Sequence, residues 1–306
     1  VKSLFYHFTF HLGELIENFI CRNNFSVQPI ITMVIYNYCY NFLTINEFWR
    51  KEKMHYTVYN EQASEHTFIA LLALGERKEV YALLADRLPQ YKIISFDLPG
   101  HNGYQPNDYT IRGFTNHLCK QLKELGLEKA HFIGNSIGAW IIQDYYKTYP
   151  DDVASLWLLD GGHFFEEKKE TEKIELPVIE RLEDLSEAIE ALANELSNPA
   201  DIPFFKDYLS KNFTFENQVY KHHANKRIVN GLAKELETTN FCADTFTVPT
   251  LLLVSEENCT HDEFRVWVSS WEEKHNLKSI MIHNSTHLLP LTNSSEVAAL
   301  IQKHIS

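Results

Sequence analysis

The stretch from His131 to Trp140, HFIGNSIGAW, constrains the fold more than any other part of the chain. It contains the pattern Gly-x-Ser-x-Gly, centred on Ser136, between a short apolar run and an amphipathic segment. This context predicts a strand that turns sharply into a helix, with the serine hydroxyl exposed at the strained turn. The glycines are required because a side chain at either position would clash where strand and helix pack closely. We interpret Ser136 as a catalytic serine, and the alternative is an ordinary turn between strand and helix.

Strand and helix patterns alternate on both sides of this motif. Continuous apolar runs, which are typical of strands buried on both faces, occur at residues 67–74, 91–96, 130–133, 153–159 and 250–255. Helical patterns follow at residues 80–88, 110–125, 137–149, 264–274 and 295–304. This alternation predicts an α/β fold with a doubly wound, mostly parallel sheet.

The alternation stops after the strand that ends at Asp160 and resumes at Val248. We therefore expect a core of residues 54–162 and 246–306, with residues 163–245 inserted as a helical lid over the site. Apolar side chains form one helical stripe at Leu182, Leu185, Ile189, Leu192 and Leu196. Aromatic residues follow at Phe204, Phe205, Tyr208, Phe213 and Phe215, and they belong either to the core of the lid or to the substrate contact. The adjacent His222 and His223 lack metal-ligand spacing, so we expect them at the surface.

Residues 1–53 differ from the rest, because they are crowded with Phe, Tyr, Asn and Ile and show no sustained period. Three interpretations are open for this atypical extension: a peripheral layer, a poor membrane anchor, or upstream sequence that is not part of the native protein. We favour the last, with Met54 as the true start, because every regular element follows Met54. The uncharged stretch at residues 29–45 falls short of the roughly 20 apolar residues that a membrane span needs.

The charge and the cysteines exclude several classes of function. A formal net charge of −13, without a basic stripe, argues against a nucleic-acid partner. The five cysteines are scattered without Cys-x-x-Cys spacing, which is typical of a reducing compartment, so we expect a cytoplasmic protein without disulfides or a zinc site. No dinucleotide-binding, P-loop or zinc-protease motif is present, so we predict no cofactor and no metal. The expected partner is a small-molecule substrate, and the oligomeric state stays open.

A serine hydroxyl is a poor nucleophile until a neighbouring base takes its proton, and an imidazole can accept and return a proton near neutral pH. His287 lies in the loop Asn284-Ser285-Thr286-His287-Leu288, after the last predicted strand at residues 279–283. It follows Ser136 in the chain and is expected at the same edge of the sheet. We therefore predict that His287 is the catalytic base.

With these features the chain resembles the α/β-hydrolase superfamily, in its lid-bearing, single-domain serine hydrolase branch. The resemblance covers the chain from about Met54 to its end. The matching pieces are Asp97-Leu98-Pro99-Gly100-His101, the turn around Ser136, Leu158-Leu159-Asp160-Gly161-Gly162, Pro249-Thr250-Leu251-Leu252-Leu253 and the His287 loop. The resemblance implies a triad of serine, acid and histidine, and it fixes the mechanism better than the substrate.

The first departure from the family pattern is the acid. The family usually has a carboxylate where this chain has Asn258, and an amide there cannot stabilise the imidazolium; the corresponding change in a serine protease lowers the rate roughly 10⁴-fold. Asp160, at the end of the strand after the motif helix, occupies a position that some members use for the acid. Asp160 therefore either supplies the carboxylate or only makes a tight turn with Gly161 and Gly162. Glu256, Glu257 and Asp262 would need a shifted loop.

The second departure is the oxyanion hole, where the family normally shows His-Gly and this chain has Leu74-Gly75. The resemblance implies that the backbone N–H groups of Glu76 and Ile137 hold the oxyanion, since only the backbone donates. A glutamate beside a forming oxyanion is unfavourable unless its side chain points to solvent. A smaller departure is the insertion of Asn102 between His101 and Gly103.

These features leave three functional hypotheses. The first is a serine hydrolase that cleaves an ester, thioester or related acyl bond of a small, largely apolar substrate through an acyl-enzyme on Ser136. The second is a non-catalytic ligand- or partner-binding protein, which the missing acid at Asn258 favours. The third is an acyltransferase on the same scaffold. We favour the hydrolase, because a binding protein has no chemical need to keep both Ser136 and His287.

Overall fold

A computed structural model describes residues 54–163, 173–193, 196 and 198–305 of the chain. The chain divides into two compact units, Val1–Arg50 and Lys51–Ser306, and the described residues all belong to the second. The extension of residues 1–53, with its three interpretations, lies outside the described residues. So does the charged beginning of the insertion, at residues 164–172.

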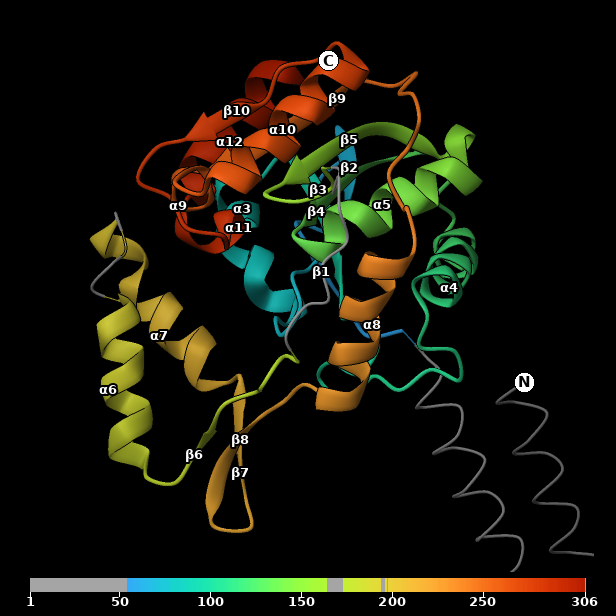
Figure 1. Cartoon of the computed structure of the whole chain (residues 1–306). Coiled ribbons are helices and arrows are strands. Elements are labelled where there is room, and N and C mark those ends of the chain that lie inside the picture. Colours follow the sequence, from blue (N-terminus) through green and yellow to red (C-terminus); the bar gives the residue numbers. More distant parts are fainter. Residues whose placement is uncertain (1–53, 164–172, 194–195, 197, 306) are drawn as a thin grey trace, which may run out of the picture. The chain divides into compact units, whose positions relative to one another are not determined.

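A seven-stranded sheet forms the centre of the unit, with the strand order β1-β3-β2-β4-β5-β9-β10 (Figure 1). The strands are β1 (Tyr56–Tyr59), β2 (His66–Leu71), β3 (Tyr91–Phe96), β4 (Ala130–Asn135), β5 (Val153–Leu159), β9 (Thr250–Ser255) and β10 (Ile280–Ile282). Only the edge pair β1 and β3 is antiparallel among these strands, and the other neighbours run parallel. The predicted α/β class with a mostly parallel sheet is confirmed.

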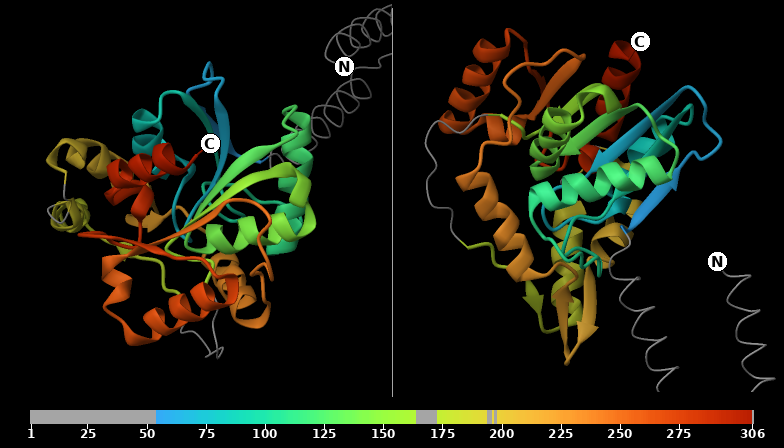
Figure 2. Two further views of the ribbon diagram at one scale, coloured as in Figure 1. Left: turned by 90° about the horizontal axis from the view of Figure 1, so that it is seen from above. Right: turned by 90° about the vertical axis from the view of Figure 1, so that its right-hand side faces the viewer.

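Helices cover both faces of this sheet (Figure 2). On one face α4 (Ile111–Glu124) packs against α5 (Ile137–Thr148), which lies directly on β4 and β5. On the other face α3 (Ala82–Arg87), preceded by the short helix η1 (Lys78–Tyr81), packs against α12 (Ser294–His304). Further helices after β9 are α9 (Glu256–Cys259), α10 (Asp262–His275) and α11 (Leu289–Thr292).

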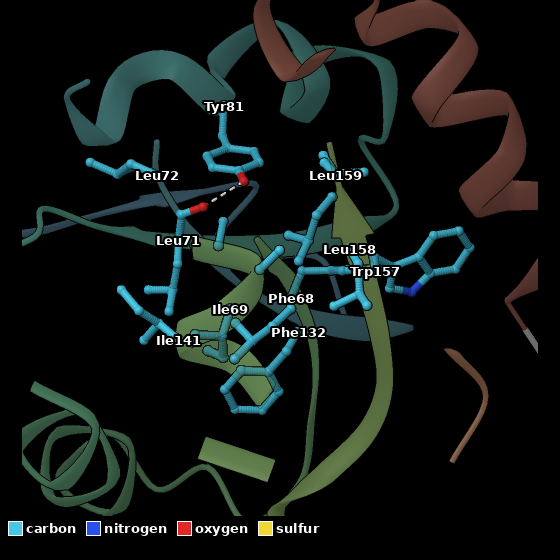
Figure 3. Packing of buried hydrophobic residues seen from close by; sticks show 14 of the residues in the cluster. Phe68, Ile69, Leu71, Leu72, Tyr81, Phe132, Ile141, Trp157, Leu158 and Leu159 are labelled. Atoms are coloured by element: carbon cyan, nitrogen blue, oxygen red, sulfur yellow. Dashed lines mark hydrogen bonds between the residues drawn. The ribbon is translucent and has the colours of Figure 1, made fainter. Parts of the chain in front are cut away.

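The core lies where the central strands meet these helices, as Figure 3 shows. Phe68, Ile69, Phe132 and Leu158 are completely buried, which is why the central strands read as unbroken apolar runs. Burial of each such side chain contributes about 1.5–3 kcal/mol. The hydroxyl of Tyr81 donates to the carbonyl oxygen of Leu71 at 2.8 Å, so η1 is tied to the end of β2.

The insertion between β5 and β9 contains more than the helices that its sequence predicts. Its described helices are α6 (Leu182–Ala193), η3 (Pro199–Asp201), α7 (Ile202–Ser210) and α8 (Lys226–Thr238), and α6 packs against α7 (Figure 1). A small antiparallel sheet of β6 (Val178–Ile179), β8 (Val219–His222) and β7 (Phe213–Glu216) was not predicted, because its strands are only two to four residues long. The apolar stripe of α6 is also only partly buried, since Leu182 and Leu192 are exposed.

The described residues also bear on the membrane and cysteine expectations. No helix among them is long and apolar enough to cross a membrane. The three described cysteines, Cys119, Cys242 and Cys259, form no disulfide with one another, whereas Cys21 and Cys39 lie outside the described residues. No group of three or more His, Cys, Asp or Glu side chains in the described ranges is arranged to hold a metal ion.

Candidate active site

Ser136 occupies the sharp turn between the last residue of β4 and the first residue of α5. Its backbone has φ 53° and ψ −124°, a strained conformation for a residue with a side chain. A Cβ atom on Gly134 would lie 2.3 Å from the Gly138 backbone, and one on Gly138 would lie 2.5 Å from the carbonyl oxygen of Leu71. The close approach of strand and helix therefore requires both glycines, and it leaves Ser136 partly exposed at the turn.

Asp160 follows β5 directly, and its side chain is fully buried. Its Oδ1 accepts from the Ser255 N–H at 2.7 Å. Its Oδ2 accepts from the Ser255 hydroxyl at 2.9 Å, from Asn258 Nδ2 at 2.6 Å and from His287 Nδ1 at 2.7 Å. An ionised carboxylate only accepts hydrogen bonds, so the charged form satisfies all four donors together. Asp160 is thus bonded to the predicted base and does more than make a turn.

His287 is held by its ring and by its backbone. Because Nδ1 faces the Asp160 carboxylate, that nitrogen carries the proton of the neutral ring, and Nε2 keeps its lone pair. The side chain is 41% exposed, so the ring is open to solvent on one side. The backbone N–H donates to Glu257 Oε2 at 2.9 Å, and the carbonyl accepts from Asn135 Nδ2 at 3.0 Å. The Asp160 bond therefore leaves Nε2 as the ring nitrogen that can accept a proton.

Asn258 lies in α9, at the position where the resemblance suggests the acid, and its role differs from that of an acid. Its Nδ2 is 3.2 Å from His287 Nδ1, but both groups are donors, and the shared acceptor is the Asp160 carboxylate. Asn258 therefore supports the buried carboxylate. Glu256 and Glu257 accept from the backbone N–H groups of Asn284 and His287, and no hydrogen bond joins either carboxylate to the described His287 ring.

Asn135, which the sequence pattern did not single out, ties the three parts of this site together. Its Nδ2 donates to the Leu159 carbonyl and to the His287 carbonyl, both at 3.0 Å. The neighbouring Ser136 N–H also donates to Leu159, at 2.9 Å. The serine turn, the Asp160 strand end and the His287 loop are therefore in direct contact. The sequence signal for Asn135 was its position before the serine in the Gly-x-Ser-x-Gly pattern, but the pattern allows any residue there.

The predicted oxyanion donors lie on two segments. Ile137 is the first residue of α5, so its N–H is one of those that a helix leaves without an intrahelical acceptor. The Glu76 N–H instead donates to the Ala73 carbonyl at 3.2 Å, in a turn where Gly75 has φ 88°. The role of the Glu76 N–H as an oxyanion donor stays a prediction. It requires this N–H to leave the Ala73 carbonyl, or to bond the oxyanion as well, when a substrate binds.

The Glu76 side chain does not simply point to solvent, which we had set as the condition for tolerating it. Its carboxylate accepts a hydrogen bond from the Tyr208 hydroxyl of α7. Burial raises the pKa of Glu76 above its ordinary value, although the Tyr208 bond and the nearby Arg77 charge oppose this shift. The Glu76 side chain is therefore anchored to the insertion.

Comparison with known proteins gives matches over much of the chain. The family model described as alpha/beta hydrolase fold matches residues 69–294. Among curated proteins, Lipase 3 of Moraxella sp. (strain TA144) is 30% identical over 110 residues, 35% of each chain. Lipase 1 of Psychrobacter immobilis is 32% identical over 118 residues, 37% of each chain. The matched region thus spans only about a third of these relatives.

Solved structures resemble the chain more extensively. E-2-(acetamidomethylene)succinate hydrolase superposes with a TM-score of 0.65 at 14% identity, covering 83% of this chain and 99% of the other. The thioesterase domain from the curacin biosynthetic pathway gives a TM-score of 0.62 at 15% identity, covering 82% and 98%. At these identities the likeness concerns the fold alone.

Proposed function

The chain belongs to the alpha/beta hydrolase fold family, and on this premise we propose that it is a serine hydrolase acting on an ester, thioester or related acyl bond. In this proposal Ser136, His287 and Asp160 form the catalytic triad. The acid comes from the end of β5, and Asn258 is its hydrogen-bond donor. The partial similarity to two lipases supports ester chemistry.

The proposed reaction proceeds through an acyl-enzyme. Ser136 Oγ attacks the carbonyl carbon while His287 Nε2 takes the hydroxyl proton, and the Asp160 carboxylate stabilises the imidazolium that forms. The backbone N–H groups of Ile137 and Glu76 stabilise the negative oxygen. His287 then gives its proton to the leaving group. A water molecule attacks the acyl-enzyme with His287 again acting as base, which restores the serine hydroxyl.

The observation that carries this proposal is the 2.7 Å hydrogen bond between Asp160 Oδ2 and His287 Nδ1. A fully buried carboxylate with four donors orients a partly exposed imidazole, and a ligand-binding protein has no need of such an arrangement. The non-catalytic hypothesis was motivated by Asn258 at the expected acid position. Because the Asp160 carboxylate is bonded to the His287 ring, Asn258 no longer favours the non-catalytic hypothesis.

The expected substrate is small and largely apolar. The described aromatic residues of the insertion include Phe205 and Tyr208, which are buried, and Phe204, which is partly buried and stacks on Tyr208 with 6.1 Å between ring centroids. Aromatic side chains of this kind can exclude water from an acyl pocket if the insertion acts as a lid. An acyltransferase would use the same acyl-enzyme with an alcohol or amine as acceptor. The cytoplasmic location stays a prediction from the cysteines.

The test is labelling of the purified full chain with a fluorophosphonate probe, together with hydrolysis of p-nitrophenyl acetate, butyrate and octanoate. We expect the probe on Ser136, and we expect Ser136→Ala to lose both labelling and hydrolysis. Ser210→Ala, an exposed serine at the end of α7, is the matched control and keeps both. A folded wild-type protein that neither labels nor hydrolyses any ester would overturn the hydrolase proposal.

A further inference from the structure

The Gly75 peptide, in the predicted oxyanion loop, is held by a histidine on each side. Its N–H donates to His101 Nε2 at 2.8 Å. Its carbonyl oxygen is 2.9 Å from His223 Nε2. His101 belongs to the core, in the segment after β3, whereas His223 follows β8 in the insertion. The two histidines therefore connect the insertion to the loop that precedes Glu76.

The hydrogen-bond partners assign opposite neutral tautomers to the two rings. His101 accepts at Nε2, so its proton is on Nδ1, which donates to the Pro99 carbonyl at 2.9 Å. His223 donates from Nε2, so its Nδ1 is the acceptor, and it receives the Asn102 N–H at 3.0 Å. All four ring nitrogens are thus used. A second proton on either ring would place an N–H against another N–H.

The surroundings keep both rings neutral. Burial lowers the pKa of His101 to about 4 and that of His223 to about 3, and the neighbouring His222 disfavours the charged form of both. Arg77 acts in the same direction on His223. The expectation that His222 and His223 lie at the surface is right only in part, because both residues are half-buried and their rings pack on each other, with centroids 4.6 Å apart.

The residue after Glu76 is also anchored to the insertion. The Arg77 N–H donates to the Tyr208 hydroxyl at 3.0 Å, and the Arg77 Nε donates to Asn212 Oδ1 at 2.8 Å. Gly75 and Arg77, which flank Glu76, are therefore both bonded to residues of the insertion. The orientation of the Glu76 peptide between them depends on these contacts.

We infer that His223 is a positioning residue for the proposed reaction: by holding the Gly75 carbonyl it fixes the oxyanion loop relative to Ser136. This inference rests on the proposed function, and it goes further by giving the insertion a part in transition-state stabilisation. Small displacements of a positioned group lower rates by up to about 10²-fold, so loss of this bond is expected to lower kcat by about 10- to 100-fold. KM is expected to change much less, because the bond does not contact the substrate.

Two amide variants separate the functions of the two ring nitrogens. In His223→Gln the amide nitrogen replaces Nε2 and can donate to the Gly75 carbonyl, so kcat is expected to stay near the wild-type value. In His223→Asn the amide oxygen replaces Nδ1 and can accept from Asn102, but the side chain is too short to reach Gly75, so kcat falls. His222→Gln is the matched control: among the described residues no hydrogen bond joins this histidine to the Gly75 peptide, and its Nδ1 accepts from the Ala224 N–H.

The readouts are kcat and KM for p-nitrophenyl butyrate and the NMR signals of the imidazole nitrogens at pH 7. A kcat loss confined to His223→Asn, with His223→Gln and His222→Gln near wild type, supports the inference. Equal kcat in all three variants overturns it while leaving the hydrolase intact. If the wild-type protein is inactive, the proposed function fails, but the NMR signals still test whether His101 and His223 hold the Gly75 peptide as neutral rings. Protonation of His101 at Nδ1 and of His223 at Nε2 supports it, and a charged or reversed ring overturns it.

Discussion

The two sides of the candidate site are held in different ways. On the acid–base side, Asp160 follows β5 and His287 follows β10, and the pair is supported by Ser255 at the end of β9 and Asn258 in α9. All four residues belong to the core. On the oxyanion side, the loop at Gly75 belongs to the core, but Tyr208 and His223 of the insertion hold it. The proposed acid–base residues thus all lie in the core, whereas the proposed oxyanion loop is held by residues of the insertion. Changes on the first side should affect proton transfer, and changes on the second should affect transition-state stabilisation.

Removal of the base should produce the largest effect and leave the oxyanion side intact. We expect His287→Gln to lower kcat for p-nitrophenyl butyrate by about 10⁴- to 10⁶-fold, because the serine loses its proton acceptor. His283→Gln, an exposed histidine just after β10, is the control and should keep the wild-type rate. Comparable activity of the two variants would mean that another group is the base.

A second carboxylate beside Asp160 should make the stability of the folded protein depend on pH. In Asn258→Asp two carboxylates share one site, and the pair is expected to retain a proton that the unfolded chain releases. When the folded pKa lies above the unfolded pKa, the bound proton stabilises the protein at low pH, and this stability is lost as the pH rises through the folded pKa. We therefore expect the free energy of unfolding of Asn258→Asp to be about 1–3 kcal/mol lower at pH 8 than at pH 5. Urea unfolding at both pH values measures this.

Asn258→Ala separates this effect from the loss of the amide itself. It removes one donor from Asp160 and should destabilise the protein by about 1–3 kcal/mol, with little dependence on pH. If Asn258→Asp instead raises kcat and shows no pH-dependent loss, the aspartate has taken over as the acid, and Asp160 is the structural residue.

Removal of one hydroxyl from the insertion should weaken the oxyanion side alone. Tyr208→Phe deletes the donor to Glu76 and the acceptor of the Arg77 N–H. We expect kcat to fall about tenfold with a small change in KM, less than the 10²- to 10³-fold that follows removal of an oxyanion donor itself. Tyr220→Phe, on β8 of the same insertion, is the control. An unchanged kcat in Tyr208→Phe would show that the insertion does not position the loop.

The smallest expected effect is a difference in acid stability between the wild-type protein and a His223 variant. The folded pKa of His223, about 3, lies below its ordinary value of 6.5, so the unfolded state binds the proton first as pH falls. The stability is therefore fully present above pH 6.5 and is lost progressively toward pH 3. The urea midpoint should fall from pH 7 to pH 5, and His223→Gln should show a smaller fall because its amide does not titrate. An equal fall in both proteins would contradict the lowered pKa.

The sequence predicted the sheet well where strands are buried on both faces. The strands at residues 91–96, 153–159 and 250–255 were predicted with their observed bounds, since an unbroken apolar run ends where the strand leaves the core. The meeting of the Ser136 turn with the His287 loop was also predictable, because the carboxyl ends of parallel strands lie at one edge of the sheet. The hydrogen bond between Asp160 and His287 was not, because the sequence left Asp160 open between an acid and a turn residue.

The support of the oxyanion loop could not be predicted for a different reason. Tyr208 lies 131 residues from Arg77, and His223 lies 148 residues from Gly75. No periodic pattern joins positions so far apart, and the short strands that place His223 carry no strong apolar signal. Asn102, which we treated as a minor insertion, proves to supply the N–H that fixes the His223 ring.

The central claim is that Asp160 is the acid of the triad, and the most direct measurement is the rate of fluorophosphonate labelling of Asp160→Asn. Asp152→Asn, which removes a carboxylate bonded to Tyr145 away from His287, is the matched control. We expect Asp160→Asn to label about 10⁴-fold more slowly than wild type, as when an amide replaces a triad acid, and Asp152→Asn to label at the wild-type rate. Labelling of folded Asp160→Asn at the wild-type rate would contradict the claim and leave Asp160 as a residue of the turn.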